Sequence, residues 1–181
     1  ANGGKSDALN AGINCARHGL VCVVDADSIL RRDALSRVVK PFVDDSRVIA
    51  SGATIANGCR ISGGQLERID LGRGFLARMQ VLEYIRAFLI GRLGWTLPNT
   101  VLIISGAFGL FGRRMIIESG GYRTNTIGED MELIVRLHER YRLRGAPYRI
   151  ASVPEPLCWT EAPASLSVLR SQRTRWQRAL A

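Results

Sequence analysis

The chain has 181 residues, of which 46% are hydrophobic, and this composition excludes a disordered chain and favours one domain with a sizeable core. The formal net charge is +9 at pH 7, which favours anionic partners such as nucleotide phosphates, nucleic acid or an acidic membrane surface. A solvated, arginine-rich surface explains the same charge without any partner.

The two ends of the sequence lead us to expect a piece of a longer protein. The chain begins with Ala1 rather than Met, and it stops at Ala181 inside a helical pattern. Part of an active site is therefore expected to lie outside these residues. The most apolar run, residues 101–111, is too short to cross a bilayer.

The first sixty residues alternate between helical and strand patterns. Gly19 and Pro41 are expected to end the two helices. This alternation predicts an α/β domain with a largely parallel sheet, in which Cys15 and Cys22 are packed thiols. The predicted elements are a helix over residues 5–19, a fully buried strand over 20–24, a helix over 31–42 and a strand over 47–52.

A basic amphipathic segment follows, from Gln65 to Leu93. Apolar residues recur there at helical spacing, with arginines between them. The pattern alone favours a surface helix packed on the sheet. The alternative is a helix on a membrane surface, where apolar side chains enter the lipid and arginines meet its phosphates. The remaining predicted elements are a strand with a Gly-rich turn over 100–114, a helix over 128–145, a strand over 148–154 and a basic helix over 165–180.

Two aspartates, Asp25 and Asp27, directly follow the first predicted strand. In open α/β sheets ligands bind beyond the carboxyl ends of the strands, and residues i and i+2 of a strand point to the same side. Two carboxylates so placed repel each other unless a cation joins them. Oxygen ligands with open positions suit Mg²⁺ or Mn²⁺, which also take substrate phosphates. The alternative is an ordinary turn with two solvated aspartates.

A second acidic pair, Glu129 and Asp130, opens the helix predicted over residues 128–145. The helix dipole stabilises a charged carboxylate at this end. A carboxylate that reaches the proton of a substrate hydroxyl can act as a general base. Taken alone, however, the pair is better explained by helix capping.

The last basic helix contains the sequence QRTRW, residues 172–176. An arginine offers a planar fork of donors that matches a diphosphate. The indole of Trp176 offers a flat apolar face on which a sugar ring can stack. The alternative is an amphipathic helix with an exposed tryptophan.

Six segments together resemble the membrane-bound, processive glycosyltransferases of family 2, which include the cellulose, hyaluronan and poly-N-acetylglucosamine synthases. The resemblance covers nearly the whole chain, and its most specific part is QxxRW downstream of DxD and ED. The segments are NGGKSDALNAG, VVDADS, IISGAFGLF, GGYRTNTIGEDMEL, VPEPLCWTEAP and QRTRW.

This resemblance implies an α/β fold of the GT-A nucleotide-diphospho-sugar transferase type, N-terminally truncated and with amphipathic interfacial helices. It therefore reverses the preference for residues 65–93 in favour of the membrane surface. It implies one catalytic domain over residues 1–181, with the donor and metal part in 1–64 and the acceptor part and interfacial helices in 65–181. The implied activity is inverting, metal-dependent transfer from a UDP-sugar to a glycan or lipid acceptor. The implied location is the cytoplasmic face of the inner membrane, with the membrane surface as a partner and no nucleic acid.

The resemblance also implies roles for individual residues. Asp25 and Asp27 hold a divalent metal, Mg²⁺ or Mn²⁺, on the donor diphosphate. Asp130 is the catalytic base that deprotonates the acceptor hydroxyl. The residues implied to contact the donor are Lys5, Asp25 and Arg175. The residues implied to contact the acceptor are Ser105, Gly106, Glu129, Gln172, Arg175 and Trp176.

Two other functions match parts of the sequence. A haloacid-dehalogenase-like phosphatase also places DxD after a buried strand, but it needs a later lysine, and neither Lys5 nor Lys40 lies at the required place. A basic module that binds nucleic acid or membrane fits the net charge. That module leaves Asp25, Asp27 and Asp130 unexplained, and no DNA-reading motif is present.

Overall fold

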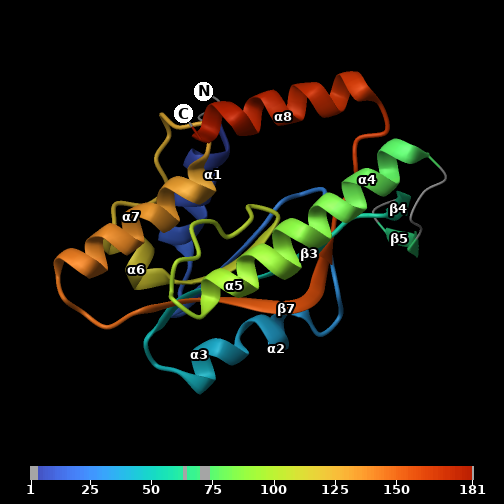
Figure 1. Ribbon diagram of the computed structural model, residues 1–181. Helices are drawn as coiled ribbons and strands as arrows, with labels where there is room; N and C mark the ends of the chain where they lie inside the picture. The colour runs from blue at the N-terminus through green and yellow to red at the C-terminus, as the bar shows by residue number, and fades with distance from the viewer. Residues whose placement is uncertain (1–3, 63–64, 70–73, 181) are drawn as a thin grey trace.

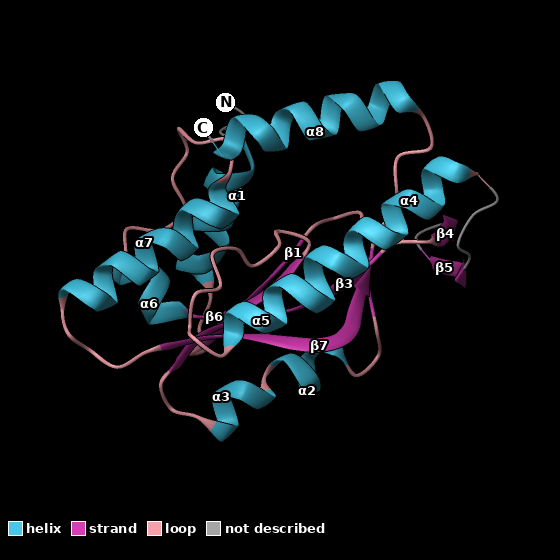
Figure 2. Cartoon of the chain, viewed as in Figure 1, coloured by secondary structure: helices cyan, strands magenta, loops and turns pink. Residues whose placement is uncertain are grey.

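The computed structural model describes residues 4–62, 65–69 and 74–180, which form a curled mixed sheet with helices packed against it (Figure 1 and Figure 2). The main sheet has the strand order β1-β6-β3-β7-β2, and β4 and β5 form a separate antiparallel pair. The strands are β1 (Leu20–Val24), β2 (Ile29–Leu30), β3 (Val48–Ala56), β4 (Cys59–Ser62), β5 (Gln65–Ile69), β6 (Phe108–Gly112) and β7 (Arg149–Trp159).

Most helices follow the periodic segments of the sequence, whereas α6 (Arg113–Glu118) was not predicted. The predicted helix over residues 31–42 is two short helices, because Pro41 lies in the first turn of the second one, where its missing N–H costs nothing. The helices are α1 (Gly4–Cys15), α2 (Ala34–Val38), α3 (Lys40–Asp44), α4 (Phe75–Tyr84), α5 (Arg92–Thr96), α6 (Arg113–Glu118), α7 (Glu129–Leu143) and α8 (Leu166–Leu180), and the π-helical segment η1 (Ile85–Gly91) joins α4 to α5.

The prediction of a largely parallel sheet is wrong. Only β3 and β7 pair in parallel among the described strands, whereas β6 pairs antiparallel with both β1 and β3, and β2 pairs antiparallel with β7. Strands β1 and β3 do run in the same direction, as the alternating pattern predicts. Strand β6 separates them, and it arrives from far along the chain, so the first sixty residues give no sign of it.

Strand β1 lies at an edge of the sheet, and its residues are alternately buried and exposed. Val21 and Val23 are buried, whereas Cys22 is exposed. The prediction of a fully buried strand is therefore wrong, and so is the prediction of packed thiols at Cys15 and Cys22, which are both exposed and free.

Two hydrophobic clusters fill the space between the sheet and the helices. One joins β1, β3 and β6 to α1, α6 and α7, and its fully buried members include Leu133 and Leu137 of α7. The other joins β3, β6 and β7 to α2 and η1, with Phe108 and Leu157 fully buried. Helices thus cover the sheet, with α6 and α7 on one side of it and α2 and α3 on the other (Figure 1).

The loop before β6 pairs with no strand and α6 begins at Arg113, so the strand predicted over residues 100–114 covers only Phe108–Gly112. Buried polar contacts fix this loop. Nε2 of His138 donates to the carbonyl of Val101 at 2.7 Å. The Asn99 side chain accepts from the Ile150 N–H at 2.9 Å and donates to the Tyr148 carbonyl at 3.0 Å. The position of the next residues, 104–107, is therefore set by α7 and β7.

The amphipathic segment is partly as predicted, since Gln65–Ile69 forms β5 and the helix begins at Phe75. One side of the helix packs inward with Val81, Phe88 and Arg92. The other side leaves large apolar side chains in solvent: Phe75, Met79, Leu82, Ile85, Leu89, Ile90 and Trp95. Within residues 4–62, 65–69 and 74–180, no helix is long and apolar enough to span a bilayer.

Candidate functional site

The structure brings six of the predicted site residues together from four parts of the chain. Lys5 comes from the first turn of α1, and Asp25 directly follows β1. Ser105 and Gly106 lie in the loop before β6, and Glu129 and Asp130 begin α7.

Asp25 is fixed by its backbone as well as by its side chain. Its N–H donates to the Ala107 carbonyl at 3.3 Å, and its carbonyl accepts from the Ser28 N–H at 3.0 Å. Asp25 and Asp27 thus belong to a turn and not to β1, so the same-side rule for strand residues does not apply to them. Asp25 is partly buried, whereas Asp27 is exposed.

Lys5 links two of the acidic side chains. Its Nζ lies 2.6 Å from Oδ1 of Asp25 and 3.2 Å from Oε1 of Glu129. Burial lowers the pKa of Lys5. The hydrogen bond and negative charge of Asp25 raise the pKa, and those of Glu129 raise it further, so that the net pKa is above its usual value. Lys5 therefore stays protonated and holds the turn after β1 against the start of α7.

Asp130 is held by two backbone donors. Its Oδ2 accepts from the Gly106 N–H at 3.2 Å, and its Oδ1 accepts from the Met131 N–H at 2.9 Å. Burial raises the pKa of Asp130, and the neighbouring charge of Glu129 raises it further, against the two hydrogen bonds and Lys5. A fixed carboxylate with a raised pKa is the state expected of a general base.

Gly106 lies where these side chains meet. A Cβ atom at this position would stand 2.7 Å from Nζ of Lys5, 3.7 Å from Oδ2 of Asp25 and 3.8 Å from Oδ2 of Asp130. Any larger residue would thus occupy the space between the lysine and the two carboxylates. Next to it, the Ser105 hydroxyl accepts from the Ala107 N–H at 3.3 Å, which closes the loop.

A small cavity adjoins Asp130, and Tyr122 forms part of its wall. Tyr122 is 4% exposed, and its backbone N–H and carbonyl are both bound by the side chain of Asn10 on α1. Burial raises the pKa of the Tyr122 hydroxyl, and the charges of Asp130, Glu129 and Asp25 add to this effect. The phenol therefore remains neutral beside the carboxylates.

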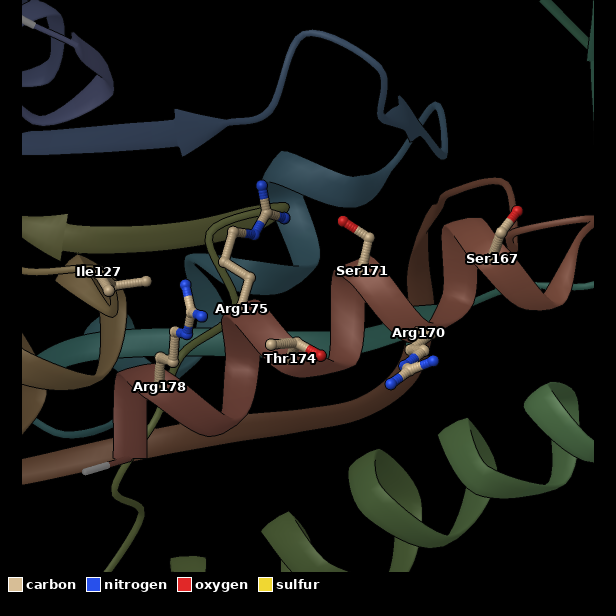
Figure 3. A pocket seen from close by; sticks show the side chains of 7 residues that line it. All are labelled: Ile127, Ser167, Arg170, Ser171, Thr174, Arg175 and Arg178. Carbon is tan, nitrogen blue, oxygen red and sulfur yellow. The ribbon is translucent and has the colours of Figure 1, made fainter.

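The third predicted group, on α8, has no hydrogen bond or ion pair to these six residues within the part of the chain that the structure describes. Arg175 lines an open groove between α8 and Ile127, which lies three residues before Asp130. Figure 3 shows Arg175 and Arg178 extending from α8 on the side of Ile127. The lining residues are Ile127, Ser167, Arg170, Ser171, Thr174, Arg175 and Arg178.

The residues of QRTRW point to different sides of α8. Arg175 lies in the groove, whereas Arg173 binds Glu83 of α4 at 2.5 Å and stacks on Trp176, with its guanidinium carbon 4.1 Å from the ring centroid. Oε1 of Gln172 is buried without a hydrogen-bond partner among the described residues. The spacing of the motif in the sequence does not predict that its arginines lie on different sides of the helix.

Two arginines and a glutamate near the site were missed as individual residues. Arg92 is 8% exposed, stacks on Phe88 at 3.8 Å, and burial lowers its pKa to about 10, with the charge of Asp130 acting against that effect. In sequence it resembles the other arginines of the amphipathic segment. Glu83 and Arg173 lie ninety residues apart, and no local pattern joins them.

The acidic groups meet the requirements for a divalent metal only in part. Among the described residues there is no cluster of three or more His, Cys, Asp or Glu side chains that could hold an ion alone. Asp25 and Asp27 offer carboxylate oxygens in one turn, and the ammonium group beside Asp25 shows that this place favours positive charge. A ligand with phosphate oxygens would complete the coordination of Mg²⁺ or Mn²⁺.

Comparison with protein families and curated proteins gives consistent matches. The sequence model of the family described as "Glycosyltransferase like family 2" matches residues 1–179. Poly-beta-1,6-N-acetyl-D-glucosamine synthase from Staphylococcus aureus (strain COL) is 36% identical over 177 residues, which are 97% of this chain and 38% of the relative. The protein of the same name from Staphylococcus epidermidis is 30% identical over 177 residues. The chain thus spans 38% of the length of these relatives.

Solved structures show the same fold at low sequence identity. Mannosyltransferase PcManGT from Pyrobaculum calidifontis, in complex with GDP-Man and Mn²⁺, matches with a TM-score of 0.64 and 21% identity over 98% of this chain and 41% of that chain. Glucosyl-3-phosphoglycerate synthase from Mycobacterium tuberculosis, in complex with Mn²⁺, UDP-Glc and glycerol 3-phosphate, matches with a TM-score of 0.52 and 14% identity over 96% and 52%. The predicted GT-A fold is confirmed.

Proposed function

The chain belongs to glycosyltransferase family 2, and from this membership we propose that it transfers a sugar from a UDP-sugar to a glycan or lipid acceptor, with inversion at the anomeric carbon. The observation that carries the proposal is the position of Asp130, a buried carboxylate fixed by two N–H donors beside the Lys5–Asp25 pair. The family membership favours this activity over the phosphatase and over a basic binding module.

The donor is proposed to bind at the turn after β1. Asp25 and Asp27 would hold Mg²⁺ or Mn²⁺ together with the donor diphosphate, and Lys5 and Arg175 would contact the donor. When bound, the metal supplies positive charge to the leaving diphosphate. Similar folds in complex with Mn²⁺ and a nucleotide sugar support this assignment. We propose residues 1–64 as the donor and metal part of a single domain over residues 1–181.

The acceptor is proposed to bind over residues 65–181. Asp130 takes the proton of the acceptor hydroxyl while the hydroxyl oxygen bonds to the anomeric carbon, and the bond from that carbon to the diphosphate breaks. Arg175 carries positive charge toward the phosphates as their negative charge grows. The residues proposed to position the acceptor are Ser105, Gly106, Glu129, Gln172, Arg175 and Trp176.

N-acetylglucosamine is the first candidate for the transferred sugar and for the repeating unit of the acceptor. The support is the name of the relative that is 36% identical over nearly the whole chain, poly-beta-1,6-N-acetyl-D-glucosamine synthase. The donor nucleotide is proposed to be UDP, as in one complex of a protein with the same fold.

We also propose that the α4–η1–α5 helix lies on the inner face of the cell membrane. Its exposed apolar side chains include Phe75, Leu82 and Ile90, which are 80%, 58% and 67% exposed. Arg86 is exposed on the same helix, and basic residues beside an apolar face suit a surface of anionic lipid. The catalytic part would then face the cytoplasm.

The proposal is tested with the full-length enzyme in membranes. Labelled UDP-N-acetylglucosamine, UDP-glucose and GDP-mannose are each supplied with Mn²⁺ or Mg²⁺, and incorporation into an oligosaccharide or lipid fraction is followed. We expect transfer from one UDP-sugar, loss of transfer with a chelator, and a β-linkage from the α-linked donor by NMR. Transfer from none of the donors, or retention of the α-configuration, would contradict the proposal.

A further inference from the structure

Helix α4 holds the tryptophan of QRTRW through one arginine. Oε2 of Glu83 lies 2.5 Å from Nη2 of Arg173, and the guanidinium carbon of Arg173 stands 4.1 Å from the centre of the Trp176 ring. The Arg173 side chain is 24% exposed and the Glu83 side chain 41% exposed, so Arg173 is the more buried member of the pair. Glu83, Arg173 and Trp176 thus form a continuous chain of contacts from α4 to the indole.

The chemistry of the guanidinium group explains why an arginine stands at the centre. Its edge carries N–H donors that bind a carboxylate, while its flat face packs on an aromatic ring. Because the group is planar, the contact with Glu83 at its edge restricts the orientation of its face. Trp176 remains 39% exposed beside Arg173, so part of the ring is open to a ligand.

A second contact fixes α8 relative to α4. Nε2 of Gln80, one turn before Glu83, donates to the carbonyl of Pro163 at 3.0 Å, and Gln80 is 2% exposed. Pro163 lies three residues before α8 begins at Leu166. The junction also buries Oε1 of Gln80 and Nη1 of Arg173 without hydrogen-bond partners among the described residues. A buried polar group without a partner costs free energy, and these two lie where α4 meets α8.

We propose that Glu83 is a positioning residue for acceptor binding: through Arg173 it fixes the plane of the Trp176 ring on which an acceptor sugar stacks. The inference rests on the proposed function, which assigns Trp176 to the acceptor. In this proposal Glu83 acts through Arg173 and not by direct contact with either substrate. Its removal should therefore weaken acceptor binding and leave donor binding and the chemical step in place.

The test compares Glu83→Gln and Arg173→Lys with wild type in the full-length enzyme in membranes. The acceptor is a β-1,6-linked N-acetylglucosamine oligosaccharide, and the donor is the UDP-sugar that the wild type uses. Arg173→Lys keeps the charge pair with Glu83 but lacks the planar group, so it separates orientation of the ring from a simple salt bridge. The matched control is Glu118→Gln, because Glu118 makes an ion pair of the same 2.5 Å length with Arg114 on α6.

We expect both variants to raise the KM for the acceptor about five-fold, with the KM for the donor and kcat at saturating acceptor within about two-fold of wild type. Glu118→Gln should leave all three values unchanged. Melting temperatures show whether each variant folds, and if only one of Glu83→Gln and Arg173→Lys folds, that variant decides alone. An unchanged acceptor KM in enzyme that still transfers sugar overturns the inference and leaves the proposed function standing. A five-fold rise in the donor KM, or a five-fold fall in kcat, also overturns it. Wild-type enzyme that transfers no sugar overturns the proposed function, and the inference with it.

Discussion

The ammonium group of Lys5 lies 2.6 Å from the carboxylate of Asp25, although the two residues are twenty positions apart and the whole of β1 lies between them. The same group lies 3.2 Å from Glu129, at the start of a helix more than one hundred residues later. One lysine therefore joins the turn proposed to hold the metal to the helix end that carries the proposed base. The charge of Lys5 is therefore expected to affect both the binding of a metal at Asp25 and the pH at which Asp130 ionises.

Replacement of Lys5 by alanine should strengthen binding of Mn²⁺ to the enzyme. Lys5 neutralises Asp25 directly, so its removal frees that carboxylate for the metal, and we expect the Kd for Mn²⁺ in the absence of nucleotide to fall roughly two- to five-fold. The measurement is a titration that follows free Mn²⁺ by electron paramagnetic resonance. Lys40→Ala is the matched control, because Lys40 is exposed on α3. Weaker Mn²⁺ binding in Lys5→Ala would show that the lysine supports the metal site instead of competing with it.

The acidic limb of the pH profile should follow Asp130. The base acts only when ionised, so kcat/KM rises with pH as Asp130 loses its proton. Burial and Glu129 raise the pKa of Asp130 above its usual value of 3.8, so the limb should lie above that value. Glu129→Gln removes one cause of the rise and should move the limb to lower pH. Lys5→Ala removes an opposing charge and should move it to higher pH. A limb that stays in place in both variants would assign it to another group.

Gly109 should be intolerant of a side chain. A Cβ atom there would stand 2.6 Å from Cγ2 of Ile104 and 2.9 Å from Cε2 of Phe111, both of which are buried. We expect Gly109→Ala to reduce the free energy of unfolding by about 1–3 kcal/mol and to displace the loop that carries Gly106. Gly12→Ala, in α1, has no atom within 4 Å of the new Cβ and should stabilise the helix by about 0.5–1 kcal/mol. Denaturation in urea measures both, and equal stability of the two variants would contradict this account of the loop.

Much of the organisation could be predicted from the sequence, because the signals are local. The acids at the start of α7 and the arginines at its end complement the helix dipole, and the predicted helix matches the observed one closely. Ordered motifs, rather than any single residue, predicted the family and the GT-A fold, and both are confirmed. The structure also brings Lys5, Asp25, Gly106 and Asp130 to one place.

The features that could not be predicted depend on contacts between distant segments. The antiparallel character of the sheet comes from β6, which enters between β1 and β3 from the other half of the chain. Cys22 lies in an apolar strand yet is exposed, because β1 is at the edge of the sheet. Arg92 and exposed Arg86 belong to the same run of arginines in the sequence, yet Arg92 is buried and stacks on Phe88. The Glu83–Arg173 contact depends on how two helices meet, which no pattern within either helix records.

The most direct test of the central claim is sugar transfer by full-length enzyme carrying Asp130→Asn. Asparagine keeps the size of the side chain and can still accept one of the two backbone hydrogen bonds, but it cannot take a proton. We predict a loss of at least about 100-fold in kcat with the melting temperature and UDP binding retained, whereas Asp44→Asn, on exposed α3, should behave as wild type. Transfer by folded Asp130→Asn enzyme at the wild-type rate would show that Asp130 is not the base and would contradict the proposed mechanism.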